Sequence, residues 1–230
     1  MNLRLKYTKA GDISYISHLD VVKLMERIFR RARLPIAYSE GFNPHPKTSF
    51  GPALGLGVQS RCEYIDIELK EEMDPQEALD RLNPVSVRGV EFTKAMKLPE
   101  RPGSIVAFLT HADYEVAVEL DDRERLGSLE LEAERINREE EILLTRKTKK
   151  GNPVSYNLKE YLGEIGIEKT EEGCLLRFTV CSGSVKSLNP RVVLEQILQG
   201  IPEEEVFVRI SKIRSYHLDE ESGEISCPIP

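Results

Sequence analysis

Two histidines stand in stretches whose neighbours could support chemistry. In "YISHLD" (15–20), His18 directly follows Ser17, where the sequence predicts a helix to begin, and "GFNPHPKTSF" (41–50) holds His45 between two prolines. A helix N-terminus presents free N–H groups and the positive end of the helix dipole, which favour anions. His18 therefore suits a phosphate contact or a general base, although a surface histidine that supports the helix cap is the alternative.

The second stretch predicts a stiff, exposed loop. Gly41 tolerates positive φ and can start a sharp turn, and the residues that precede the two prolines are restricted to extended geometry. Such a loop presents Phe42, Asn43, His45 and Lys47 to a ligand at little entropic cost. The alternative is a rigid connection that shields an edge of a sheet.

If His18 and His45 share one cleft, they could act as base and acid on an RNA phosphate without a metal ion. The sequence leaves open whether the two rings meet. A metal site would need a third ligand, for which Asp20 and Cys62 are the nearest candidates. We therefore expect no metal and no cofactor. The signatures of nucleotide-binding loops, α/β-hydrolases and zinc proteases do not occur.

Basic side chains gather in two places. One group recurs at helical spacing after His18, and the other follows a predicted strand near residue 145, as a hairpin arm. Either group could neutralise RNA phosphates, and a solvated charged surface is the alternative for each. With the loop, they make up the predicted nucleic-acid contacts: Lys23, Arg27, Arg30, Arg31, Phe42, Asn43, His45, Lys47, Arg146, Lys147, Lys149 and Lys150.

The overall charge argues against a wholly basic nucleic-acid binder. The 230 residues carry a net charge of −7, but residues 1–50 hold nine Lys and Arg against four Asp and Glu. They are therefore +5 and the remainder −12, which indicates a local anionic partner. No apolar run is long enough to cross a bilayer, and the four cysteines form no C-x-x-C pair. We expect a cytoplasmic protein with reduced thiols.

The elements that must position these residues follow from hydrophobic periodicity. The first half predicts strands at 2–8, 35–39, 62–69 and 87–98, with helices at 18–33 and 75–82. The second half predicts strands at 114–120, 141–150, 173–183 and 204–218, with helices at 122–137 and 190–198. Both follow the order β-α-β-β-α-β, so we predict an α+β fold of two tandem ferredoxin-like units with antiparallel sheets. The expected domains are 1–100 and 101–218, followed by a tail at 219–230, poorly ordered or attached to a sheet edge.

The densest motifs carry a resemblance to a known family. "SHLD", "RRARLPIAYSEGFNPHP" and "LGVQSRCEY" resemble signature blocks of the radical-SAM-linked protein family, a domain of unknown function found beside, or fused to, radical SAM proteins. The resemblance implies a bacterial cytoplasmic protein that works with a radical SAM enzyme. This chain lacks the C-x₃-C-x₂-C cluster motif, so we expect the catalyst to be the partner. The predicted fold is also similar, more weakly, to the repeat-processing endoribonucleases of CRISPR systems.

Three functions follow from these features. The first is an accessory RNA-binding protein that presents or recognises an RNA substrate for a radical SAM enzyme, with Phe42 or Tyr38 stacking on bases. The second is a metal-independent ribonuclease that uses His18 and His45. The third is a protein-interaction module whose loop at 41–50 docks on the radical SAM partner. Membrane binding is not expected.

Overall fold

The computed structural model describes residues 1–120, 122–147 and 151–230, and these divide into two compact units. Unit 1 comprises Met1–Thr110 and Ser211–Pro230, and unit 2 comprises His111–Ile210. The predicted domain limits at 100 and 218 differ from these bounds. Because the last long strand continues into unit 1 from residue 211, the residues expected to end the second domain and form a tail belong to the first unit.

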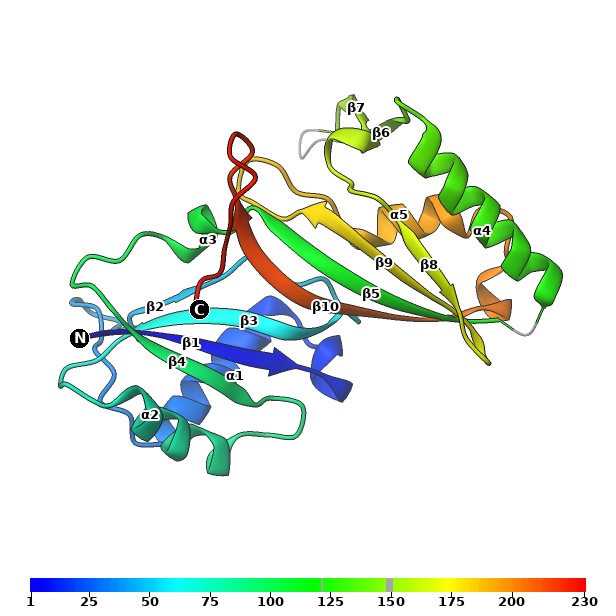
Figure 1. Ribbon diagram of the computed structural model, residues 1–230. Helices are drawn as coiled ribbons and strands as arrows, with labels where there is room; N and C mark the ends of the chain where they lie inside the picture. The colour runs from blue at the N-terminus through cyan, green and yellow to red at the C-terminus, as the bar shows by residue number, and fades with distance from the viewer. Residues whose placement is uncertain (121, 148–150) are drawn as a thin grey trace. The chain divides into compact units, whose positions relative to one another are not determined.

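Unit 1 has a sheet in the order β4-β1-β3, and both β2 and β10 lie on the outer edge of β3. The strands β1, β2, β3 and β4 are antiparallel to their neighbours. In Figure 1, α1 and α2 cover one face of this sheet. The elements are β1 (Asn2–Lys9), α1 (His18–Arg31), β2 (Thr48–Phe50), β3 (Gln59–Glu68), α2 (Pro75–Leu82), β4 (Phe92–Leu98), α3 (Ile105–Phe108) and β11 (Ile225–Ser226), with 3-10 helices at Gly11–Tyr15 and Asn83–Val85.

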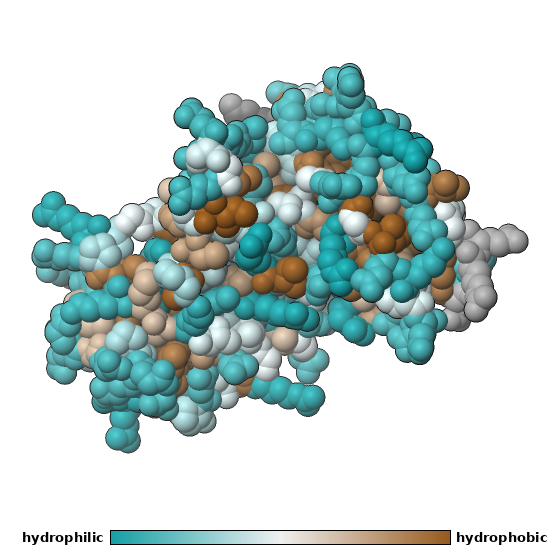
Figure 2. All heavy atoms as spheres, viewed as in Figure 1, coloured by the Kyte–Doolittle hydropathy of each residue, from teal (hydrophilic) through white to brown (hydrophobic). Residues whose placement is uncertain are grey.

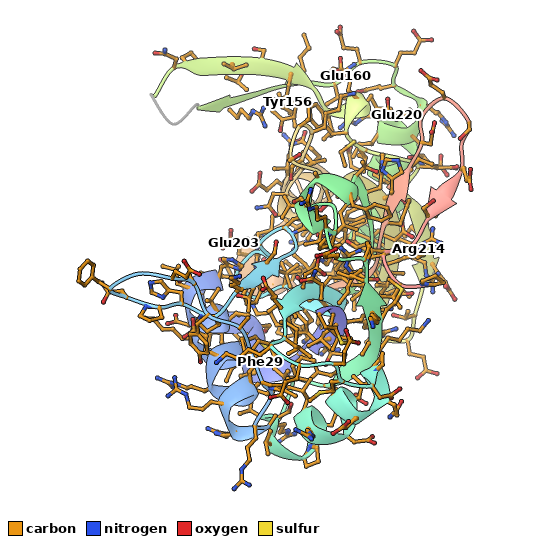
Figure 3. All side chains as sticks on the ribbon, turned by 90° about the vertical axis from the view of Figure 1, so that its left-hand side faces the viewer. Phe29, Tyr156, Glu160, Glu203, Arg214 and Glu220 are labelled. Carbon is orange, nitrogen blue, oxygen red and sulfur yellow. The ribbon has the colours of Figure 1, made fainter. Side chains whose placement is uncertain are left out.

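Helix α1 begins and packs as the sequence predicts. The Ser17 hydroxyl oxygen accepts a hydrogen bond from the Asp20 backbone N–H and donates one to the Asp20 carboxylate, which caps the first turn. The apolar side of the helix is buried against the sheet, and Figure 3 shows Phe29 inside unit 1. Removing one such side chain typically costs about 2–5 kcal/mol, so this packing fixes which side of α1 faces water. The buried residues are Val21, Met25, Ile28 and Phe29.

The second strand of unit 1 differs from the prediction. Residues 35–39 form only isolated bridges, Ile36 to Leu69 and Tyr38 to Pro46, and regular pairing starts at Thr48. The cause is that the chain doubles back over 37–47, and its two prolines cannot donate backbone hydrogen bonds to a ladder.

Unit 2 repeats the same topology with an inserted ribbon. Its sheet has the order β10-β5-β9-β8, and β6 and β7 form a separate two-stranded sheet. The predicted strand at 141–150 is therefore wrong as a member of the main sheet, because it pairs with the nearby β7 and β8 takes the edge position. The elements are β5 (His111–Glu119), α4 (Arg123–Arg138), β6 (Leu143–Lys147), β7 (Pro153–Asn157), β8 (Gly166–Lys169), β9 (Gly173–Cys181), α5 (Pro190–Ile197) and β10 (Phe207–Leu218), with 3-10 helices at Leu158–Glu160 and Glu203–Glu205.

The α+β class with largely antiparallel sheets is confirmed. The expected tail is attached: β11 pairs with the end of β10, and Ile229 is buried on the unit 1 sheet. Figure 2 shows that the visible surface is mostly hydrophilic, with hydrophobic residues exposed only in small areas.

Candidate functional site

The outward side of α1 carries a row of side chains at every fourth position. The row is Leu19, Lys23, Arg27 and Arg31, all of which are exposed. At a rise of about 1.5 Å per residue, successive members stand about 6 Å apart along the axis. Arg30 is exposed beside the row, and Arg31 also donates a hydrogen bond to the backbone oxygen of Val85 at 3.5 Å. We call the four cations Lys23, Arg27, Arg30 and Arg31 the basic ridge.

The basic ridge is not neutralised by neighbouring acids. On α4, Arg135 and Arg138 each pair with glutamates one turn away at 2.7 to 2.8 Å. By contrast, Lys23, Arg27 and Arg30 make no ion pair and no side-chain hydrogen bond within the part of the chain that the structure describes. Cations without partners produce a positive surface potential that attracts anions.

His18 lies at the start of α1 and is half-buried. Its ring meets the ring of Phe50 edge-on, with 5.5 Å between the centroids and 84° between the planes. The side chain is therefore partly held by an aromatic neighbour on β2 and partly open to solvent. The arrangement positions the ring, but no hydrogen-bond partner among the described residues orients it as a general base.

The predicted loop is a hairpin over 37–47, which we call the finger. Backbone groups of Lys47 and Ala37 close its base at 2.8 Å, and Ser39 and His45 join its arms through Ser39 N–H to His45 C=O at 2.9 Å and His45 N–H to Ser39 Oγ at 3.0 Å. Gly41 adopts φ 125° at the turn, where other residues are strained. Phe42 next to it is fully exposed. The finger stands out from unit 1 in Figure 3, where its ribbon is light blue.

The finger has little positive charge to offer a phosphate. The Lys47 ammonium pairs with the Glu68 carboxylate at 2.9 Å. Glu40, also exposed, adds a negative charge at the turn. Phe42, Asn43 and His45 are exposed as predicted, but their surroundings resemble a protein contact more than an anion site.

The structure does not join the two histidines. Within the described residues, no hydrogen bond or ring contact connects His18 to His45. His18 contacts Phe50, and Phe50 follows His45 by five positions of mostly extended chain, about 17 Å at ~3.3 Å per residue. No contact among the described residues therefore brings the two rings together, and a shared acid–base pair on one phosphate stays a prediction.

The basic arm is described in part. Arg146 on β6 lies over the ring of Tyr156 on β7, 5.2 Å from its centroid, and this ring in turn meets Tyr161 edge-on at 5.5 Å. Lys147 is described through its backbone alone, and Lys149 and Lys150 lie outside the described residues.

A buried charged cluster in unit 1 went unnoticed in the sequence. Lys212 Nζ and Glu63 Oε1 lie 2.6 Å apart, and Lys9 donates to the Ile16 carbonyl at 3.2 Å. Burial lowers the pKa of Lys9, Glu63 opposes this shift, and the charge of Lys212 adds to it. The signal was available, because Lys9 continues the alternation of the apolar residues at 3, 5 and 7.

Neither a metal centre nor a membrane span is seen in residues 1–120, 122–147 and 151–230. No three His, Cys, Asp or Glu side chains there are grouped to hold a metal ion. No helix in those ranges combines the length and apolar character needed to cross a bilayer.

A family model described as "Uncharacterized protein conserved in bacteria (DUF2344)" matches residues 2–190. The chain belongs to this family. No curated protein matches the sequence. A chain in the crystal structure of a Cbf5-Nop10-Gar1 complex aligns with a TM-score of 0.51 and 14% identity, covering 93% of this chain and 48% of that one.

This likeness shows the fold alone, and the chain spans about half the length of that neighbour. A chain of a heavy metal efflux pump aligns with a TM-score of 0.24 and 10% identity, covering 92% of this chain and 28% of that one, which is too low to argue from.

The thiols offer a direct test of the buried surroundings. Burial raises the pKa of Cys62 and of Cys174 to about 11, whereas Cys227 is exposed. A raised pKa means less reactive thiolate, so at pH 8 roughly one thiol in a thousand is ionised at these two sites. Iodoacetamide should alkylate Cys227 within minutes and leave Cys62 and Cys174 unmodified in the native protein, as measured by peptide mass spectrometry. Denatured protein, alkylated at all sites, is the control, and equal native labelling would contradict the packing.

Proposed function

We propose that this protein is an accessory RNA-binding protein that presents or recognises an RNA substrate for a radical SAM enzyme. One observation carries the RNA contact: the basic ridge of α1 is exposed, and three of its four cations have no partner among the described residues. Releasing counterions from phosphates is the main source of affinity for nucleic acid. The resemblance of the "SHLD" and "GFNPHP" blocks to the radical-SAM-linked family supports the choice of enzyme partner.

The acidic total charge is compatible with this function. The exposed arginines of unit 2 that are paired with glutamates contribute little to its surface potential, and the basic ridge is a local feature of unit 1. Such an arrangement makes the basic ridge the main surface for an anionic ligand. The arm with Arg146 is a second proposed contact, since its guanidinium and the Tyr156 ring could hold a phosphate and a base.

The finger is the better candidate for the protein partner. A fully exposed Phe on a hairpin closed by backbone hydrogen bonds is a preorganised aromatic anchor, and such anchors dominate protein interfaces. The paired Lys47 and the exposed Glu40 disfavour phosphate at the same place. We therefore assign the basic ridge to RNA and the finger to the enzyme. No observation favours the ribonuclease.

Replacing Arg27 and Arg30 by glutamine tests the RNA contact. Two lost phosphate contacts should weaken binding of a fluorescein-labelled single-stranded RNA and reduce the slope of log K against log salt by about 1.4. Fluorescence anisotropy over a salt series measures both. The matched control is Arg138→Gln with Arg209→Gln, two exposed arginines that pair with glutamates. Unchanged affinity and slope in the α1 variant would reduce the ridge to a solvated face.

The same mixtures distinguish binding from cleavage. In EDTA the RNA should remain intact on a denaturing gel, because no contact among the described residues joins His18 and His45 into an acid–base pair. Cleavage that disappears in both His18→Ala and His45→Ala would replace this proposal by the ribonuclease.

Replacing Phe42 by alanine tests the finger. Loss of a hot-spot aromatic costs at least about 2 kcal/mol, so a radical SAM protein that co-purifies with the wild type should fall roughly 30-fold with the variant, as quantified by mass spectrometry. Val185→Ala, another exposed apolar side chain, is the control, and RNA affinity should not change. Equal recovery with both variants, or no radical SAM protein with the wild type, would refute the assignment.

A further inference from the structure

The face of the unit 1 sheet that lies opposite α1 and α2 is covered by other parts of the chain, which leaves it inaccessible to nucleic acid. Many ferredoxin-like RNA-binding domains stack bases on this face. Here Cys62 and Tyr64 are buried beneath α3 and Ile229. The next part of the face is sealed by Arg4, which holds Asp66 through two hydrogen bonds and also reaches the Pro228 carbonyl. A ligand that contacts the basic ridge must therefore find any base contacts on the helix side.

Three exposed apolar side chains lie near the N-terminal end of the ridge, and we call them the platform. Tyr15 and Leu19 are each 71% exposed, and Leu56 is 59% exposed. The 3-10 helix that ends at Tyr15 and the loop that carries Leu56 are held together by a hydrogen bond from the Gly57 N–H to the Ser14 carbonyl at 2.9 Å. Leu19 belongs to the same every-fourth row as Lys23, Arg27 and Arg31, so the platform and the basic ridge form one surface.

The signs of the charges differ between the two ends of this surface. Asp12 and Asp20 are exposed beside the platform, whereas the rest of the outward row is cationic. Phosphate is repelled at the acidic end and attracted along the ridge. A nucleobase is neutral, has two apolar faces and can give its amino hydrogens to a carboxylate, so it suits the platform.

We propose that the RNA bound by α1 is single-stranded, with its phosphates along the basic ridge and an unpaired base stacked on Tyr15, Leu19 and Leu56. This inference rests on the proposed function and adds the class of RNA. The bases of a duplex are stacked inside the helix and cannot reach the platform, whereas those of a loop or free end can. Arg31 lies 12 residues from Leu19, about 18 Å along the helix, which is long enough for a few nucleotides.

The test compares two RNA probes and two variants of one residue. A labelled 12-nucleotide single strand and a blunt 12-base-pair duplex are titrated by fluorescence anisotropy over one common salt series against wild type, Tyr15→Ala and Tyr15→Phe. We expect the single strand to bind at least about 10-fold tighter than the duplex. Tyr15→Ala should weaken its binding by about 10-fold, the range of one lost base stack, without changing the salt slope. Tyr15→Phe keeps the ring and should restore affinity.

The other outcomes overturn the inference in distinguishable ways. The platform is not a base site if the duplex binds as tightly as the single strand, or if Tyr15→Ala binds RNA like the wild type. If Arg27→Gln with Arg30→Gln still weakens binding in that case, the proposed RNA contact stands. An unaffected Tyr15→Ala would leave the platform to a protein contact. If neither RNA binds at all, both proposals fail. Because Tyr15 is largely exposed, its replacement should leave the fold intact.

Discussion

The packing of α1 against the sheet of unit 1 determines which of its side chains can reach a ligand. Burying Met25, Ile28 and Phe29 completely or almost completely leaves the helix one rotational setting. In that setting the outward row, which has a member at every fourth position from Leu19 to Arg31, faces water. The cap at Ser17 fixes the first turn, and with it the place of His18 against Phe50. The exposed charge of α1 is thus a consequence of its core.

The two charged helices α1 and α4 differ in how many of their basic side chains are ion-paired. Both α1 and α4 carry four basic residues, but α1 holds two acidic residues and α4 holds four. The glutamates of α4 stand one turn from its arginines and neutralise them at close range. Glu26 stands four residues before Arg30 on α1, a spacing at which pairs often form, yet the two make no ion pair. An anionic ligand is therefore the simpler explanation for cations on α1 that pair with no acid.

Local signals allowed much of the fold to be predicted from the sequence. The Ser17 cap, the alternation in β1 and the apolar spacing of α1 depend on neighbours in the chain, and their elements appeared where expected. The misassigned elements depend on distant partners. The local sequence does not indicate that the edge strand begins at Thr48 and not in residues 35–39. It also does not indicate that residues 211–230 belong to unit 1. The same holds for the candidate site. The exposure of the basic side chains on α1 could be predicted from local spacing. The ion pair that reduces the positive charge of the finger joins Lys47 to Glu68, 21 positions away, and could not.

A map of where RNA touches the protein tests the proposed RNA surface. A single-stranded RNA containing 4-thiouridine is cross-linked to the full chain by ultraviolet light, and the modified peptides are identified by mass spectrometry. We expect most cross-links in residues 11–31 and in the loop around Leu56, with a second, smaller group around Arg146, and a yield that falls as salt is raised. Cross-links confined to the α4 and α5 surface of unit 2, or spread evenly over both units at every salt concentration, would contradict it.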